Sequence, residues 1–200
     1  MSTGALERAV RRSVRPLAGD GERCDMCGLA VPEPHRHVLN EQQGELMCTC
    51  RACTLLFQRD AAGRGHYRLV PETRRRLPEL APKDVGVPVG LVFLVPHSDG
   101  TVTANYPSPM GATQHQVEPE LWAGLRRRSP MLGEMTPEVQ ALLLHTARGA
   151  KEHWLVPIDD CYRLVALIRR EWRGLSGGST VWPAIEQFFA ELAEPRRSTF

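Results

Sequence analysis

Residues 24–53 read CDMCGLAVPEPHRHVLNEQQGELMCTCRAC and gather most of the side chains in this chain that bind soft metal ions. These are Cys24, Cys27, His35, His37, Cys48, Cys50 and Cys53. Among the 200 residues only one further cysteine occurs, Cys161. Two C-x2-C pairs bound the stretch, and two such turns supply the four thiolates of a tetrahedral zinc site. The spacing therefore predicts a small metal-binding module.

The predicted ligands are the four cysteines of the two pairs, Cys24, Cys27, Cys50 and Cys53. We expect zinc in a structural role, because so short a segment buries too little apolar surface to fold alone. Cys48, His37 and His35 are candidates for additional or substitute ligands, and binding of a second ion stays open. Iron in the same thiolates is the alternative, as in rubredoxin. The second pair, CRACT, lacks the glycine of a rubredoxin-like turn.

A β-hairpin is predicted between the two pairs, because HRHVLNEQQGELMCTC places the turn residues EQQG between two strand-like segments. A four-residue loop there pairs His37 with Cys48 and His35 with Cys50. Since residues two apart on a strand share a face, these four side chains should point the same way. A loop one residue longer or shorter would undo this register.

Changes in composition predict four segments, namely residues 1–20, 21–71, 72–86 and 87–195. The first is a helical or flexible segment. The second is the Cys/His-rich module, with a helix at TLLFQRD after the last cysteine and a strand at HYRLV. The third, rich in proline and arginine, is a linker. The fourth is an α+β domain. The predicted fold class is α+β: an N-terminal zinc-ribbon or treble-clef-like module followed by an antiparallel sheet with about three packed helices.

Two strand pairs are predicted in the fourth segment. The apolar run VGLVFLV, the turn residues SDG and the alternating TVTANY form one hairpin. ALLLHTA and EHWLVPI form the other, although TPEVQALLLHTA also fits a helix capped by Thr136. The stretch YPSPMGATQ between them is predicted to be a loop, because it is rich in proline and small residues.

Three helices complete the fourth segment. VEPELWAGLRRR has Pro119 near its first turn, where proline is well tolerated. CYRLVALIRREWR carries an apolar stripe and has Asp159 or Asp160 as its predicted cap. VWPAIEQFFAEL follows Ser179 or Thr180 and has apolar residues at helical spacing.

The composition limits the class of protein. With 42% hydrophobic and 24% charged residues the chain should bury a globular core. A net charge of +2 is too small to indicate a nucleic-acid or membrane partner. The N-terminal MSTGALERAVRRSVRPLAG lacks the apolar run of a secretory signal, and the longest apolar segment is too short for a membrane span. We expect a cytoplasmic location, where reduced thiols favour a metal site over disulfides.

Catalytic alternatives are weaker. A metal-dependent hydrolase using His35 or His37 would need an open metal position. A nuclease of the histidine and metal type would need a further His or Asn in the helix after Cys53, and TLLFQRD has neither. Cys161 lies near Asp159 and Asp160, which invites a nucleophile hypothesis. Its place on the apolar stripe favours a buried role instead.

The motifs PIDDCYRLVALIRREWRGLSGG, VW..I..FF..L, YPSPMGAT and HRH...CTCRAC resemble an uncharacterised bacterial family of domains of unknown function. The resemblance covers residues 22–193. Members are found mainly in actinobacteria, often encoded beside actinobacterial-type nickel-iron hydrogenases. One departure is that GATQHQ stands where a Glu-Ser is expected after GAT. The resemblance implies an accessory role, with a hydrogenase subunit or maturation factor as protein partner.

The predicted function is therefore that of a non-enzymatic, zinc-binding accessory or adaptor protein, which assists assembly or function of a nickel-iron hydrogenase. A rubredoxin-like electron carrier with one iron is the first alternative. A metal-dependent hydrolase and a nucleic-acid-binding zinc ribbon are the others, and the arginine runs at 74–76 and 126–128 would have to form one patch for the last.

Overall fold

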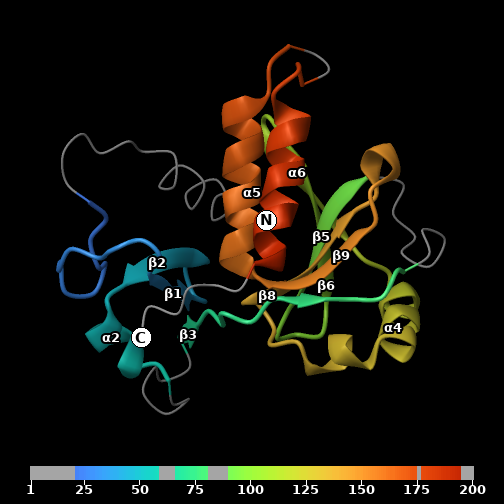
Figure 1. The fold of residues 1–200 in the computed structure, drawn as a ribbon. Coiled ribbons are helices and arrows are strands. Elements are labelled where there is room, and N and C mark those ends of the chain that lie inside the picture. The colour runs from blue at the N-terminus through green and yellow to red at the C-terminus, as the bar shows by residue number, and fades with distance from the viewer. Residues whose placement is uncertain (1–20, 59–65, 81–89, 175–176, 195–200) are drawn as a thin grey trace. The chain divides into compact units, whose positions relative to one another are not determined.

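The computed structural model describes residues 21–58, 66–80, 90–174 and 177–194, and the chain divides into two compact units (Figure 1). The first unit ends at Pro71, and the second runs from Glu72 to Pro195. The helical or flexible segment predicted for residues 1–20 lies outside the described residues.

The first unit contains a three-stranded antiparallel sheet with strand order β2-β1-β3. Its elements are β1 (Arg36–Asn40), β2 (Glu45–Thr49), α2 (Arg51–Leu55) and β3 (Tyr67–Leu69). His37 lies opposite Cys48 across β1 and β2, which confirms the predicted hairpin and its register. The strand predicted at HYRLV is confirmed as β3. The helix α2 begins three residues before the predicted TLLFQRD segment and is short.

Asn40 holds the turn of this hairpin at four residues. Its side-chain Oδ1 accepts hydrogen bonds from the backbone N–H groups of Gln42 (3.1 Å) and Gln43 (3.3 Å). Its carbonyl oxygen accepts from the N–H of Gly44 at 2.7 Å, and Gly44 has φ +63°, a conformation that suits glycine. Because the loop length sets the register, Asn40 also fixes which side chains of the two strands face each other.

The second unit is built on a six-stranded antiparallel sheet with strand order β4-β9-β8-β5-β6-β7 (Figure 1). The strands are β4 (Arg75–Arg76), β5 (Leu91–Pro96), β6 (Val102–Ser108), β7 (Gly111–Gln116), β8 (Gln140–His145) and β9 (Glu152–Pro157). The helices are α4 (Pro119–Arg128), α5 (Ile158–Glu171) and α6 (Val181–Ala193), with 3-10 turns η1 (Pro130–Glu134) and η2 (Ala147–Gly149). Both predicted strand pairs and all three predicted helices are confirmed, and Pro119 opens α4.

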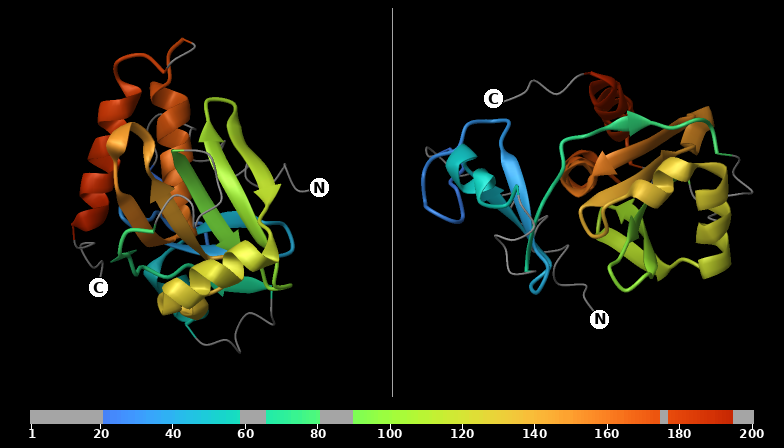
Figure 2. Two further views of the ribbon diagram at one scale, coloured as in Figure 1. Left: turned by 90° about the vertical axis from the view of Figure 1, so that its right-hand side faces the viewer. Right: turned by 90° about the horizontal axis from the view of Figure 1, so that it is seen from below.

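Both faces of this sheet are buried. Leu94 of β5 and Leu142 of β8 share a core with Trp122 of α4. On the opposite face, α5 packs on β8 and β9, and α6 lies beside α5 (Figures 1 and 2). His145 of β8 stacks on Phe189 of α6, so alternate residues of that strand face the two helices. Burial on both faces explains why β5 and β8 are continuous apolar runs.

Two predictions about this unit are wrong. YPSPMGATQ is not a loop, since it supplies the end of β6 and the start of β7, which pair through Ser108 and Gly111. Neither Asp159 nor Asp160 caps α5. The N-cap is Pro157, and both acids lie in the first helical turn. Thr180 is at the N-cap position of α6, without a side-chain capping hydrogen bond.

Residues 72–80 belong to the segment predicted as a linker, and they contribute to the second unit. Arg75 and Arg76 form β4 and pair with Leu155 and Trp154 of β9. Leu77 is buried in the same core as α4. No helix among the described residues is long and apolar enough to cross a membrane.

Candidate metal centre

The four cysteines of the two C-x2-C pairs come together in the first unit. The sulfur atoms of Cys24, Cys27, Cys50 and Cys53 all lie within 4.8 Å of one another, and no disulfide joins these free thiols. The sulfur atoms of Cys27 and Cys50 are 3.7 Å apart. Four sulfurs at about 2.3 Å from a tetrahedral zinc ion would be about 3.8 Å from each other. One sulfur pair therefore has the spacing that a tetrahedral ion requires, and the other pairs are no more than 4.8 Å apart.

The turn that carries the first pair, Cys24 and Cys27, is a tight loop closed by backbone hydrogen bonds. The N–H of Gly28 donates to the carbonyl of Cys24 at 2.8 Å, and the N–H of Cys24 donates to the carbonyl of Leu29 at 2.8 Å. Arg23 and Ala30 form an isolated antiparallel bridge next to it. Gly28 has φ +75°, which residues with a side chain rarely adopt. The glycine after the first pair is thus needed for the turn that presents both thiols.

Asp25, inside the first turn, ties this turn to β2. Its N–H donates to the carbonyl of Cys48 at 2.9 Å, and its Oδ2 accepts from the N–H of Cys48 at 2.7 Å. These two hydrogen bonds bring Cys24 and Cys27 beside the strand end that leads to Cys50. Nothing in the sequence singles out Asp25, because its partner is known only once the chain is folded.

The second turn is fixed by the start of α2. Cys50 is the N-cap residue, and its Sγ accepts a hydrogen bond from the N–H of Cys53 at 3.5 Å. The carbonyl of Cys50 accepts from the N–H of Thr54 at 2.9 Å. Thr54 is buried and its hydroxyl lies 3.1 Å from that of Thr49. Both thiols of the second pair are therefore held by the strand-to-helix junction.

The thiols of the four-cysteine cluster differ in pKa because they lie close together and in different surroundings. Burial raises the pKa of Cys24, but hydrogen bonds from the backbone of Cys50, Cys27 and Met26 outweigh it and lower this pKa to about 6. Burial and the neighbouring thiols raise the pKa of Cys53 to about 12. A second or third thiolate is unfavourable in so small a volume unless a cation is present. The cluster is thus suited to a positively charged ion.

His35, His37 and Cys48 form a separate group, whose ligand atoms also lie within 4.8 Å of one another. The rings of His35 and His37 have centroids 4.7 Å apart and are tilted by 54°. The prediction that Cys50 joins this face is wrong. Strand β2 ends at Thr49, so alternation stops there and Cys50 turns to the four-cysteine cluster.

The residues of this second group shift one another's pKa values. The pKa of His35 is raised chiefly by its interaction with the Cys48 sulfur, against the opposing effects of burial and of His37. Burial alone would raise the pKa of Cys48, but both imidazoles outweigh it and lower this pKa. The carboxylate of Glu22 lies 3.3 Å from Nε2 of His35. Cys48 is therefore a more readily ionised thiol than an ordinary buried cysteine.

Comparison with known proteins gives the family of the chain. A family model described as a family of unknown function, DUF5947, matches residues 23–196. The chain belongs to this family. The DUF5947 match includes every residue of the two metal-ligand groups and the whole of the second unit. No curated protein and no solved structure matches the chain.

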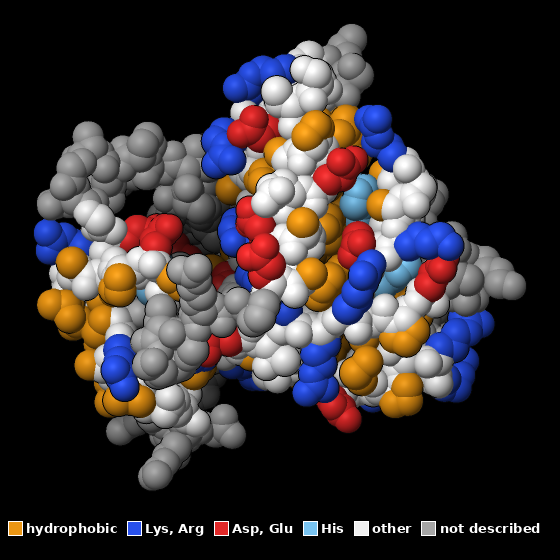
Figure 3. Space-filling model, in the orientation of Figure 1, with side chains coloured by type: hydrophobic (Ala, Val, Ile, Leu, Met, Phe, Trp, Pro, Cys, Tyr) orange, Lys and Arg blue, Asp and Glu red, His pale blue; other side chains and the backbone are white. Residues whose placement is uncertain are grey.

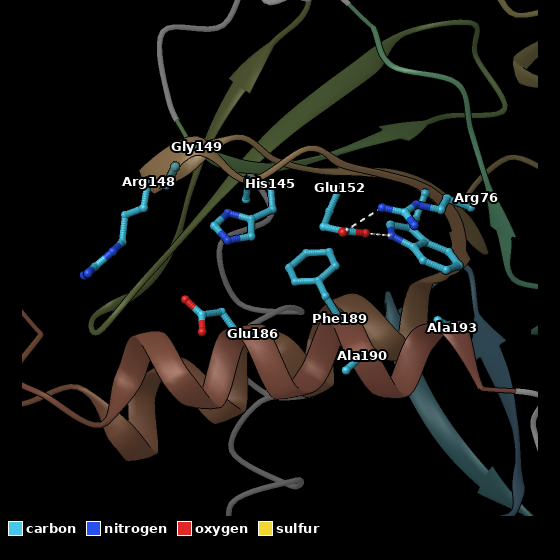
Figure 4. A pocket seen from close by; sticks show the side chains of 12 residues that line it. Arg76, His145, Arg148, Gly149, Glu152, Glu186, Phe189, Ala190 and Ala193 are labelled. Carbon is cyan, nitrogen blue, oxygen red and sulfur yellow. Dashed lines mark hydrogen bonds and ion pairs between the residues drawn. The ribbon is translucent and has the colours of Figure 1, made fainter.

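The second unit of this DUF5947 chain has a cleft of about 490 Å³ between α6 and the β8–β9 end of the sheet (Figure 4). Glu152 accepts hydrogen bonds there from Arg76 (2.8 Å) and from Nε1 of Trp154 (2.7 Å). Nδ1 of His145 lies 3.1 Å from the carbonyl of Gly90, and burial lowers the pKa of His145. Arg76, Glu152 and Trp154 thus form a hydrogen-bonded group in the lining of this cleft.

Cys161 is buried, as predicted. It has no exposed surface, and burial raises the pKa of its thiol well above the ordinary value. A thiol that resists ionisation is a poor nucleophile.

Acidic and basic side chains are interspersed over α5 and α6 on the face shown in Figure 3. This mixture is typical of a solvated surface.

Proposed function

We propose that the DUF5947 chain binds one zinc ion through Cys24, Cys27, Cys50 and Cys53, and that this ion holds the first unit folded. The supporting observation is the convergence of four thiols within 4.8 Å, in which one sulfur pair, Cys27 and Cys50, has at 3.7 Å the spacing that a tetrahedral ion requires. The ion takes a structural role because the four protein ligands fill its coordination shell.

The small core of the first unit supports a structural role. Among the described residues of this unit, the buried apolar side chains are Cys24, Val31, Val38, Leu39, Cys50 and Val70. Two of these are metal-ligand cysteines. So few apolar side chains cannot offset the loss of conformational entropy on folding, which a metal ion does in small modules. The order of turn, hairpin and ligand-bearing helix also fits a treble-clef-like zinc module.

The proposed role is that of a non-enzymatic accessory protein that docks a protein partner. Leu29, Leu55 and Leu56 follow the two metal-ligand turns and are 61%, 54% and 60% exposed. Hydrophobic side chains gather on the first unit in Figure 3. An exposed apolar patch on a small module is typical of a protein-binding surface. The partner proposed from the resemblance is a nickel-iron hydrogenase subunit or one of its maturation factors.

Metal analysis with an absorption spectrum tests the zinc proposal on protein purified without a tag or added metal. We expect a colourless protein in which Cys50→Ser loses zinc, while Cys161→Ala, a cysteine outside the metal groups, retains it. Iron with visible charge-transfer bands would replace the structural proposal by an electron-carrier function.

The partner proposal is tested separately. We expect the wild-type protein to bind a purified hydrogenase subunit or maturation factor, and Leu55→Asp with Leu56→Asp to abolish this binding while zinc content is unchanged. Met110→Asp is the matched control, because Met110 is 89% exposed on the second unit. Equal binding by wild type and the double variant would refute the proposed surface.

A further inference from the structure

We infer that His35, His37 and Cys48 form a second transition-metal site, distinct from the four-cysteine cluster, with one coordination position left for an exchangeable ligand. This goes beyond the proposed function, because a three-ligand site binds a metal in a reactive or exchangeable form. It does not rest on the structural zinc, since its three residues are separate from the four cysteines.

The hairpin geometry brings the three ligands together. His37 and Cys48 are directly opposite each other on β1 and β2, where side chains on one face come close. His35 precedes His37 by two residues and falls on the same side, with its ring centroid 4.7 Å from that of His37. One ligand atom from each residue lies within 4.8 Å of the other two. The centre of such a triangle is at most about 2.8 Å from each ligand atom, so small side-chain adjustments bring all three to the bond lengths of about 2.0–2.3 Å that zinc requires.

The buried ring nitrogens of His35 lack well-formed hydrogen bonds, although Nε2 lies 3.3 Å from the Glu22 carboxylate. Its side chain is only 7% exposed, and among the described residues neither Nδ1 nor Nε2 has a hydrogen bond of ordinary geometry. Burying an imidazole without hydrogen bonds is unfavourable. The polar groups beside it are the Cys48 sulfur and the Glu22 carboxylate, which are themselves metal-ligand types. A bound cation would satisfy the ring and balance the charge of Glu22.

The ligand residues are held in place before any ion binds. Asp25 bonds both the N–H and the carbonyl of Cys48, at 2.7 and 2.9 Å. The hydroxyl of Thr49 donates to the carbonyl of Arg36 at 3.0 Å, which braces the two strands next to the ligands. A site whose ligands are fixed by surrounding hydrogen bonds loses little entropy when it binds a metal.

The ligand chemistry selects the metal class. Two imidazoles and one thiolate suit divalent ions such as Zn²⁺, Co²⁺ or Ni²⁺, whereas Mg²⁺ and Ca²⁺ prefer oxygen ligands. With three protein ligands a tetrahedral ion keeps one position for water or a small anion, unlike the closed four-thiolate site. The second site should therefore hold its metal more weakly and exchange it more readily.

The test counts Co²⁺ bound to the tag-free full chain, by titration followed by absorption and by native mass spectrometry. We expect the wild type to bind about two equivalents. The His37→Asn variant should lose the more weakly bound Co²⁺ ion of the second site and keep the Co²⁺ spectrum of a four-thiolate site. The Cys50→Ser variant should lose the Co²⁺ ion of the four-cysteine cluster. His66→Ala is the matched control, because His66 lies in the same unit outside both groups and should change nothing.

A second readout detects the exchangeable position. Azide added to the protein with both sites loaded should change the part of the Co²⁺ spectrum that His37→Asn removes, and leave the four-thiolate bands unchanged. Binding of only one equivalent by the wild type would overturn the inference, whether or not the variants fold. Two equivalents with no loss in His37→Asn, His35→Gln or Cys48→Ala would overturn it as well.

Discussion

Arg74 donates two parallel hydrogen bonds to Asp160, from Nε to Oδ2 and from Nη2 to Oδ1, both 2.7 Å long. The side chains are 11% and 1% exposed, so this is a buried, bidentate ion pair between the segment before β4 and the first turn of α5. The pair fixes the start of the second unit to its longest described helix. Asp160 therefore serves the fold, although its position beside Cys161 suggests catalysis when only the sequence is known.

Arg74→Ala should lower the free energy of unfolding by about 3–5 kcal/mol, because it removes the bidentate partner of the buried Asp160 carboxylate, from which the Arg163 guanidinium is more distant, at 3.6 Å. Urea unfolding followed by tryptophan fluorescence measures the loss. Arg75→Ala is the control, since the Arg75 side chain is 52% exposed and 3.9 Å from Glu134, and it should cost less than about 1 kcal/mol. Similar losses for the two variants would contradict the assignment.

Two glycines in the second unit should respond to alanine with opposite signs. A Cβ at Gly90 would lie 2.4 Å from Cβ and 2.6 Å from Cα of Ala147, so Gly90→Ala should destabilise the protein by about 1–3 kcal/mol. A Cβ at Gly124, inside α4, would meet only Nη2 of Arg127, at 3.8 Å. Gly124→Ala should stabilise by about 0.5–1 kcal/mol. Thermal unfolding of both variants checks the signs, and a loss at Gly124 would refute the argument.

The sequence predicts the hairpin register because EQQG between two strand-like segments fits a four-residue loop, and the hydrogen bonds of Asn40 confirm that loop length. It does not predict where Cys50 points. Strand alternation assigns Cys50 to the face of His37, but β2 ends at Thr49 and the chain turns into α2. The division into two ligand groups depends on that one strand end, where the hydroxyls of Thr49 and Thr54 lie 3.1 Å apart across the strand-to-helix junction, and the ends of elements are the part of a fold that sequence patterns predict least well.

The β6–β7 hairpin is missed for a related reason. Pro107 suggests a loop because proline lacks the N–H that a strand needs. In the structure, the pairing of β6 with β5 ends at Asn105, two residues before Pro107. Pro107 pairs only with Ala112 of β7. Pro107 therefore lies beyond the paired part of β5 and β6, and only the observed extent of that pairing reveals this.

His97 should give the second unit a pH-dependent stability. Its Nδ1 lies 2.9 Å from Oε2 of Glu138, and this hydrogen bond raises the pKa of His97 against the effect of burial. Because the pKa of His97 is raised in the folded state, the contribution of the pair to stability is complete below the pKa of the unfolded state, about 6.5, and is lost as the pH rises through the pKa of the folded state. The Glu138→Gln variant should not show this loss of stability.

Urea unfolding at several pH values from about 5.5 to 9 measures this dependence. The wild type should lose stability relative to Glu138→Gln as the pH rises, and the difference should be about 1 kcal/mol or less because both side chains are partly exposed. His115→Gln, outside the pair, should follow the wild type. Parallel curves for wild type and Glu138→Gln would show that the pair does not carry the effect.

Removing the metal should unfold the first unit and spare the second. The first unit has few buried apolar side chains besides its cysteines, whereas the second has its own core on both faces of a six-stranded sheet. After treatment with a strong chelator, hydrogen exchange should accelerate in peptides from residues 21–58 and 66–71 and stay slow in β5 and β8. Cys50→Ser should reproduce this pattern without chelator, and adding zinc back should restore protection only in the wild type. Unchanged exchange in β1 and β2 after complete removal of the metal would mean that the hairpin is stable on its own, and the structural role of the ion would be lost.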